Sequence, residues 1–374
     1  MKQFIYADNA ATTKLDPVAY EAMLPWLKEE YANASQPYSF SRSAKKALAE
    51  ARALIAECIN AKPEEIFFTS GGTESDNWAI KGSAFADFGH RAIITSQIEH
   101  HAVLRSCEAI ERLGYPVIYL PVNKDGTVLP ETLERNISDN TRLVSVMLAN
   151  NEIGTIQPIK DLVRIAHKHG ALFHTDAVQA VGHIPIDVQD LGVDLLSASA
   201  HKFNGPKGIG FLYLRQGTPI VSFMDGGSQE NGLRAGTENI AAIVGMATAL
   251  KNNYDHIKEN IEHICELENQ LITAMNESGI HYVRNGGDSI LPGLVSLSFM
   301  NQSGEFLLHR LDLKGVAIST GAACNGDNDE ISHVLKAMNI QEDLAMGTIR
   351  ISIGKNNNTE DVFSIIKKLK QICE

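Results

Sequence analysis

The sequence predicts an α/β protein in which helices flank a parallel or mixed central sheet, with a smaller second α/β domain. Short apolar runs alternate with helix-like stretches from about residue 60 to 215, which is typical of an α/β sheet. A chain of 374 residues exceeds what one hydrophobic core usually supports, so two domains are expected. The hydrophobic fraction of 44% and charged fraction of 21% are ordinary for a folded protein with a sizeable core.

The strands expected in the large domain are short apolar runs. Sheets of this kind bind ligands at the carboxyl ends of their strands, where helix N-termini supply unpaired N–H groups. We therefore expect the site residues in the loops that follow the strands. In chain order the predicted strands are IFFT before Ser70, RAIITS, VIYLP, LVSVMLA, ALFHT, DLLSASA and GIGFLYL.

The C-terminal third has the pattern of a second compact unit. Residues 237–275 carry a long helical pattern, which predicts a linker helix between the domains. We expect residues 15–256 to form the large domain, and residues 1–14 and 257–374 the small one. The N-terminal segment should add a strand or turn to the small domain. After the linker we expect a strand at VSLSFM, a helix around GEFLLHRLDLK, a Gly-rich loop at GAACNGDND, a helix at SHVLKAM, the strand TIRISIG and a last helix from Asn358.

Composition and charge argue against several classes of function. The formal net charge of -12 disfavours broad contact with nucleic acid or an anionic membrane, because their phosphates would be repelled. No stretch has the apolar length of a signal peptide core or a membrane span, so a cytoplasmic protein is expected. The five cysteines lie far apart without a C-x-x-C pair, so we predict free thiols and no metal site.

The strongest local signal is the segment SASAHKFNGPKG at residues 197–208, a strand that ends in a polar, Gly-rich turn holding Lys202. A lysine in this position can be desolvated, with a pKa low enough to form a Schiff base with an aldehyde cofactor. A solvated surface lysine is the alternative interpretation of this segment alone.

Two upstream segments carry groups suited to the same kind of cofactor. Asp176 lies just past a predicted buried strand, where its carboxylate could keep a pyridine nitrogen protonated, although an ordinary helix cap is the alternative. The run Ser70 to Thr73 opens a helix, and its N–H groups and Thr73 hydroxyl suit a phosphate. It matches neither a nucleotide P-loop nor a dinucleotide fingerprint. A phosphate cradle, a strand-end acid and a strand-end lysine together predict a pyridoxal 5'-phosphate (PLP) site.

Three more residues fit such a site. His100 follows the predicted strand RAIITS, where its imidazole could stack on the pyridine ring and move protons. Asn151 follows LVSVMLA, where its amide could bind the phenolic oxygen of the cofactor or the substrate. Cys324 lies in a polar loop suited to an exposed, mobile thiol, whereas the other four cysteines lie in helix-like segments among apolar neighbours. A loop cysteine without a function is the alternative.

The sequence resembles the cysteine desulfurase family nearly end to end, specifically the branch used in iron–sulfur cluster assembly and tRNA thiolation. The block around Lys202 and the position of GAAC before SHVL are the specific parts of the resemblance. The length of the loop from Cys324 to Ser332 is typical of this branch. The remaining motifs that carry the resemblance are ADNAATT, TSGGTESDN, EHHAV, ANNEIGTIQPI, FHTDAVQAVG, RAGTEN and TIRISIG.

The resemblance implies a homodimeric fold-type I PLP-dependent transferase that removes sulfur from L-cysteine and releases L-alanine. Lys202 would bind the cofactor covalently, His100 would stack on its ring, and Cys324 would receive the sulfur as a persulfide for an acceptor protein. Thr237 would reach the phosphate of the neighbouring protomer. Arg350 would clamp the substrate carboxylate, and Asn151 would also contact the substrate. The other cofactor-binding residues implied are Gly72, Thr73, Asn151, Asp176, Gln179, Ser199 and His201.

Some positions depart from the usual sequence of the family. The acidic loop from Asn325 to Ile331 replaces a more Ser-rich one. Its carboxylates should raise the pKa of Cys324 and alter which acceptor docks. A selenocysteine lyase, or another PLP-dependent lyase or aminotransferase on the same fold, is the enzymatic alternative. A PLP-binding scaffold that docks partners is the non-enzymatic alternative.

Overall fold

The structure, a computed structural model, describes residues 4–320 and 331–373. The strands of its larger sheet are β2 (Ile66–Thr69), β3 (Ala92–Ser96), β4 (Val117–Leu120), β5 (Thr141–Ser145), β6 (Leu172–Asp176), β7 (Leu195–Ser199) and β8 (Gly210–Leu214). Within the described residues this sheet has seven strands in the order β2-β8-β7-β6-β5-β3-β4. β8 is antiparallel to both neighbours and the other pairs are parallel. The prediction of an α/β protein with a mainly parallel central sheet is confirmed.

The strand predicted over LVSVMLA is shorter than expected. β5 ends at Ser145, but the chain continues beside β6, because Val146 N–H donates to His174 O at 3.1 Å and Leu148 N–H donates to Asp176 O at 2.8 Å. The residues beyond Ser145 therefore follow the edge where β6 ends, and they lead directly into the loop that holds Asn151.

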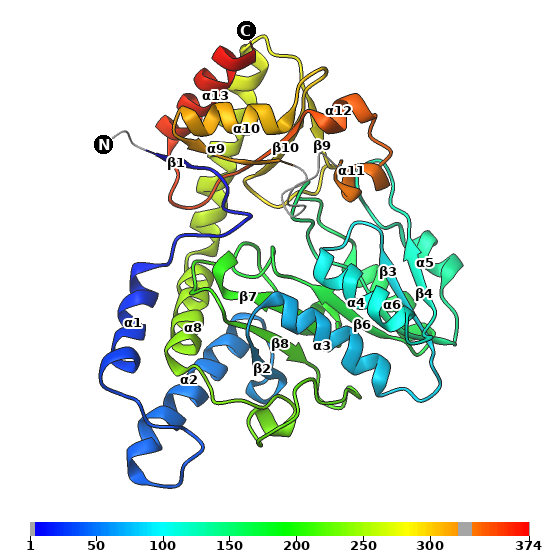
Figure 1. Ribbon diagram of the computed structural model, residues 1–374, viewed down its shortest axis with the longest axis vertical. Coiled ribbons are helices and arrows are strands. Elements are labelled where there is room, and N and C mark those ends of the chain that lie inside the picture. The colour runs from blue at the N-terminus through cyan, green and yellow to red at the C-terminus, as the bar shows by residue number, and fades with distance from the viewer. Residues whose placement is uncertain (1–3, 321–330, 374) are drawn as a thin grey trace.

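Helices cover both faces of this sheet (Figure 1). They are α1 (Pro17–Lys28), α2 (Arg42–Cys58), α3 (Gly72–Phe85), α4 (His101–Glu111), α5 (Pro130–Asn136), α6 (Ile159–Lys168), α7 (Val188–Leu191) and α8 (Ile240–Asp255). Successive strand residues point to opposite faces. Leu195 accordingly packs in one apolar cluster with Trp78 of α3 and Val103 of α4. Its neighbour Leu196 packs in another with residues of α2, α6 and α8.

The C-terminal part has a sheet and an apolar core of its own, at the top of Figure 1. Within the described residues, four strands pair antiparallel in the order β12-β13-β10-β9. The N-terminal segment adds β1, which pairs in parallel with β11, as predicted. The elements are β1 (Ile5–Tyr6), α9 (Ile257–Glu277), β9 (Val283–Asn285), β10 (Leu294–Ser298), α10 (Gly304–Leu313), β11 (Val316–Ala317), β12 (Ser319–Thr320), α11 (His333–Ala337), α12 (Glu342–Met346), β13 (Thr348–Ser352) and α13 (Thr359–Cys373).

The predicted linker helix is two helices, α8 and α9, which meet at His256. In a continuous helix the N–H of His256 would donate to the carbonyl of Asn252. Here that carbonyl lies 2.9 Å from the ring Nδ1 of His256, and the backbone N–H of His256 caps Tyr254 O instead. At the interruption of the helix, the ring of His256 takes the place of its own backbone N–H at the carbonyl of Asn252.

The separate apolar core is compatible with the two predicted domains, whose boundaries at residues 14/15 and 256/257 stay predictions. Among residues 4–320 and 331–373, no helix has the length and apolar character needed to cross a membrane.

Candidate active site

A cavity of about 370 Å³ lies where β6 and β7 end, beside the N-terminus of α3. Most of its lining comes from loops at the carboxyl ends of the parallel strands, as predicted for this class of sheet. Arg350 reaches the cavity from β13 in the C-terminal part, so both sheets contribute. The sequence-predicted residues that line it are Gly72, Thr73, His100, Asn151, Asp176, Gln179, Ser199, His201, Lys202 and Arg350.

Lys202 ends a short 3₁₀ turn, Ala200–Lys202, that directly follows β7. Its side chain is half-buried, and Nζ donates hydrogen bonds to Ala10 O at 2.5 Å and Ala11 O at 2.9 Å. The amine is therefore held inside the cavity by the N-terminal segment. The interpretation of Lys202 as a solvated surface lysine does not fit this position.

Asp176 is the last residue of β6 and is buried. Its Oδ1 accepts a hydrogen bond from Val178 N at 2.9 Å, but the residues that follow form turns, so the helix cap considered for this residue does not form. Burial raises the pKa of Asp176 to about 6, against the opposing effects of that hydrogen bond and of the Lys202 charge. The carboxyl group is therefore ionised at neutral pH and faces the cavity together with Lys202.

The N-terminus of α3 forms a cradle on one side of the cavity. Gly71, which caps the helix, has φ +150°, and a Cβ added to Gly72 would lie 2.5 Å from Val178 Cγ2. The N–H groups of the first helical turn have no partner within the helix and attract anions. Ser199 is buried beside this turn, and its Oγ lies 3.5 Å from the position that a Cβ of Gly71 would take.

His100 caps α4, because its Nδ1 accepts the Ala102 N–H at 3.1 Å. With Nδ1 accepting, a neutral ring carries its proton on Nε2. Burial, and then the positive charges of Lys202 and His101, lower the pKa of His100 to about 4. At neutral pH the ring is therefore uncharged.

Arg350 is buried in β13, where two hydrogen bonds fix its guanidinium group. Nη2 donates to Asp8 Oδ1 at 2.8 Å, and Nη1 donates to the backbone oxygen of Asn151 at 2.7 Å. Its Nε has no hydrogen-bond partner among the described residues. The guanidinium thus joins the N-terminal segment, the Asn151 loop and the smaller sheet at one cavity.

Ala10 and Ala11 of the N-terminal segment and Asp76 of α3 line the cavity but were not predicted from the sequence. Gln179 Nε2 donates to Ala10 O at 2.9 Å, and His201 Nδ1 lies 3.1 Å from Thr12 Oγ1, so the N-terminal segment forms one wall. Asp76 of α3 also lines the cavity, is buried, and has no hydrogen bond at Oδ1 within the described residues. The N-terminal segment contains the motif ADNAATT, and Asp76 lies in TSGGTESDN. Both motifs were noted for the family resemblance, and this was the signal that could have indicated these residues.

Thr237 is a predicted site residue that is not brought to this cavity. Its side chain is exposed. Cys324 lies outside the described residues. The other four cysteines form no disulfide with one another in the part of the chain that the structure describes, and they lie in α2, α4, α9 and α13, helices as the sequence predicted. Burial raises the pKa of each of them, and that of Cys58 reaches about 12.

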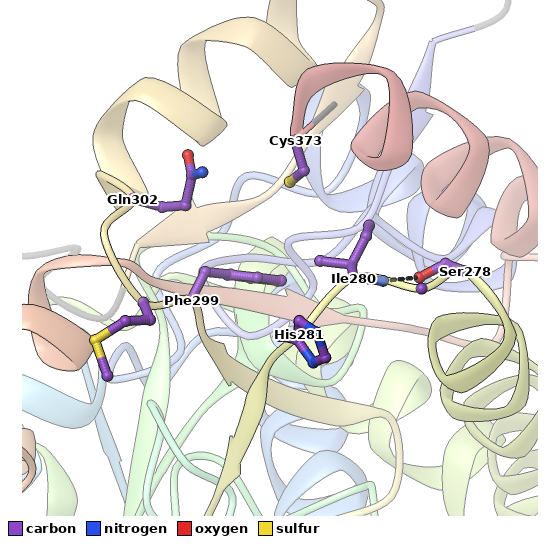
Figure 2. Close-up of a pocket in the computed structure, with 8 residues that line it drawn as sticks. Ser278, Ile280, His281, Phe299, Gln302 and Cys373 are labelled. Atoms are coloured by element: carbon purple, nitrogen blue, oxygen red, sulfur yellow. Dashed lines mark hydrogen bonds between the residues drawn. The ribbon is translucent and has the colours of Figure 1, made fainter.

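A second cavity, of about 280 Å³, lies beside the last turn of α13 in the C-terminal part (Figure 2). Cys373 and His281 line it, and Ile280 N–H donates to Ser278 Oγ at 3.1 Å within it. None of the described residues that line it is an acid, a lysine or an arginine. It has no primary amine for a Schiff base, whereas the cavity at β6 and β7 brings together Lys202, Asp176 and Arg350 and is the candidate active site.

Known proteins resemble the chain over its whole length. Residues 5–365 match the aminotransferase class-V family. A protein from Dictyoglomus turgidum named cysteine desulfurase IscS is 49% identical, over 100% of this chain and 95% of that protein. The chain belongs to the cysteine desulfurase family. A solved structure named NifS-like protein superposes with a TM-score of 0.93 at 39% identity and covers 99% of both chains. Another, SspA in complex with cysteine, gives 0.84 at 37% identity over 95% of this chain and 100% of that one.

Cysteine desulfurases are PLP enzymes, and the cavity fits that cofactor. The first turn of α3 offers its unpaired N–H groups to an anion, and Val178 leaves no room for a side chain at position 72. The ionised Asp176 suits a protonated pyridine nitrogen, and Lys202 supplies a primary amine in the same space. The phosphate, the ring nitrogen and the aldehyde of PLP thus each have a matching protein group in this cavity.

Proposed function

We propose that this protein is a PLP-dependent cysteine desulfurase that transfers the sulfur of L-cysteine to Cys324 and releases L-alanine. The observation that supports it best is the convergence of Lys202, Asp176 and Arg350 on one cavity. These groups match the aldehyde and ring nitrogen of the cofactor and the carboxylate of an amino acid.

Cofactor binding would rest on four parts of the cavity. Lys202 would hold the aldehyde carbon, and Asp176 would pair with the ring nitrogen. Gly72, Thr73, Ser199 and His201 would hold the phosphate, with His100 against the ring and Gln179 and Asn151 near its phenolic oxygen. PLP supplies an electron sink for charge that develops at the α-carbon of the substrate.

Substrate binding would use Arg350, whose planar fork suits a carboxylate. Asp8 and the backbone of Asn151 hold the guanidinium in place. Its position on β13 would bring the amino acid to the part of the cavity that the smaller sheet lines. Asn151 would contact the substrate from the same loop.

Proton transfer would involve Lys202 and His100. Lys202 lies where it can take a proton from the substrate once its amine is released. His100, uncharged at neutral pH with its proton on Nε2, can donate that proton toward the cavity. Because Nδ1 is engaged with Ala102, the ring cannot rotate without losing the helix cap.

Sulfur transfer would break the carbon–sulfur bond of cysteine and form a sulfur–sulfur bond at Cys324. The thiol of Cys324 loses its proton, the substrate carbon gains one, and the products are alanine and a persulfide. Burial keeps the other four thiols protonated, which disfavours them as nucleophiles. An acceptor protein for cluster assembly or tRNA thiolation would collect the sulfur.

A homodimer would complete the site. Residues 29–41, between α1 and α2, lie far from the C-terminal part (Figure 1) and expose aromatic side chains. Tyr31 is 84% exposed, and its ring lies 5.2 Å from that of Phe40. Exposed aromatic pairs are enriched at interfaces between proteins. Thr237, which is exposed here, would reach the phosphate of the second copy.

Mass spectrometry of the protein after a single turnover with cysteine tests the proposal. We expect a persulfide on the peptide that contains Cys324 and on no other cysteine peptide, with one alanine released per persulfide. Alanine release without a persulfide would instead favour a selenocysteine lyase or another PLP-dependent lyase. No product at all would favour the scaffold.

A further inference from the structure

The start of α11 is attached at two points to segments that carry lining residues of the candidate active site. Ser332 and His333 are its N-cap and first residue, and Cys324 precedes Ser332 by eight positions in the sequence. Each of the two contacts a direct neighbour of a predicted site residue. Ser332 contacts Glu152, which follows Asn151, and His333 contacts Glu99, which precedes His100.

The first attachment is a buried hydrogen bond. Ser332 Oγ donates a short hydrogen bond to Glu152 Oε2 and accepts the Val334 N–H at 3.0 Å. Both Glu152 and Ser332 are buried, and Asn150 Oδ1 holds the backbone N–H of Glu152 at 2.9 Å. The hydroxyl of Ser332 is thus held by a carboxylate and by the N-terminus of a helix. These two hydrogen bonds favour one position of the Ser332 side chain.

The second attachment joins the same helix to the His100 segment. A ring nitrogen of His333 lies 2.9 Å from Glu99 O, and its ring packs 4.8 Å from that of His101. Glu99 is itself fixed, because its carboxyl accepts hydrogen bonds from Ser96 Oγ at 2.6 Å and Met147 N at 3.0 Å. The wall that receives His333 is therefore rigid.

Apolar packing supports both attachments. One buried apolar cluster contains Ile98 and Ile153 together with Val334 and Leu335 of α11 and with Met338, which directly follows this helix. Ile98 lies one position before Glu99, and Ile153 lies one position after Glu152. The hydrogen bonds thus act on a helix that is already seated, and they determine the position of its first turn rather than whether it docks.

We propose that Glu152, acting through Ser332, is a positioning residue for sulfur transfer. It fixes the point at which the chain rejoins the active-site wall after the segment that contains Cys324. The inference rests on the proposed function, in which the Cys324 thiol must meet the substrate sulfur. The rate of such a meeting depends on where the tether of the thiol is anchored.

Single-turnover kinetics with cysteine test this role. In Glu152→Ala and Ser332→Ala, we expect persulfide formation on Cys324 to slow by about tenfold or more. Cofactor absorbance and the cysteine concentration for half-maximal spectral change should stay within about twofold of wild type. Glu152→Gln, which keeps an acceptor oxygen for Ser332, should recover most of the rate. The double Ala variant should be no slower than the slower single one, because the two residues act as a pair.

Ser303→Ala is the matched control, because Ser303 Oγ caps α10 through Phe306 N and does not line the cavity. It should form the persulfide at the wild-type rate. The inference fails if Glu152→Ala forms the persulfide at the wild-type rate. It also fails if cysteine affinity falls in parallel with the persulfide rate, since Glu152 would then act on Arg350. If Glu152→Ala does not fold, the persulfide rate and cysteine affinity of Ser332→Ala test the inference by the same criteria. A wild type that forms no persulfide would overturn the proposed function instead.

Discussion

His100 has two tasks that a substitution can separate. Its Nδ1 caps α4, and its ring lines the cavity. His100→Ala should lose both, with about 1 kcal/mol less stability from the lost cap. His100→Asn keeps a good capping side chain but removes the imidazole.

We expect His100→Asn to unfold in urea at nearly the wild-type midpoint and to release alanine about 100-fold or more slowly. His100→Ala should show the same activity loss at a lower midpoint. A His100→Asn protein with wild-type turnover would show that the ring moves no proton in the rate-limiting step.

The predicted site residues differ in how well the sequence indicated them. Lys202 and Asp176 each follow a recognisable apolar strand, so their place at the carboxyl edge of a sheet could be predicted. Asp8 and Ala10 precede any periodic pattern, and their roles as partners of Arg350 and Lys202 arise from tertiary contacts alone. The burial of Asp76 likewise depends on the strands that α3 packs against.

At the scale of elements, Gly210 lets β8, β7 and the turn before α3 approach closely. A Cβ at Gly210 would lie 2.4 Å from Ala198 O and 2.8 Å from Gly71 Cα. These are backbone atoms, so they cannot move aside without shifting the cradle or the strand that leads to Lys202.

Gly210→Ala should therefore destabilise the cofactor-free protein by about 2–4 kcal/mol in urea unfolding and weaken PLP binding in a titration. Gly89→Ala is the control, since the nearest atom to its Cβ would be 3.6 Å away. Equal stability of the two variants would show that the cradle has more freedom than these distances allow.

Element types followed from periodicity, but some element ends did not. The apolar runs for β2, β6, β7 and β8 correspond to strands because both faces of the sheet are covered. The long helical pattern did not reveal the break at His256, which depends on a bond from the ring to Asn252. The periodicity of apolar residues indicates which face of an element is buried. It contains no information on a hydrogen bond between one side chain and the nearby backbone.

At the scale of the whole molecule, dimerisation should depend on the exposed aromatic pair Tyr31 and Phe40. A Tyr31→Asp, Phe40→Asp double variant would place two charges in an apolar interface, which is costly. Light scattering should show a dimer for wild type and a shift toward monomer for the variant. Leu313→Asp, on the distant and 77% exposed end of α10, should stay dimeric. A double variant that remains fully dimeric would place the interface elsewhere.

The most direct test combines absorbance and alanine release for wild type, Lys202→Ala and Cys324→Ala. We expect wild type to be yellow after free PLP is removed, and to release alanine from cysteine when a reductant is present. Lys202→Ala should lose the absorbance band on the same treatment. Cys324→Ala should keep the band and change it on adding cysteine, but release almost no alanine. A colourless wild type would contradict the cofactor site, and wild-type alanine release by Cys324→Ala would contradict sulfur transfer to Cys324.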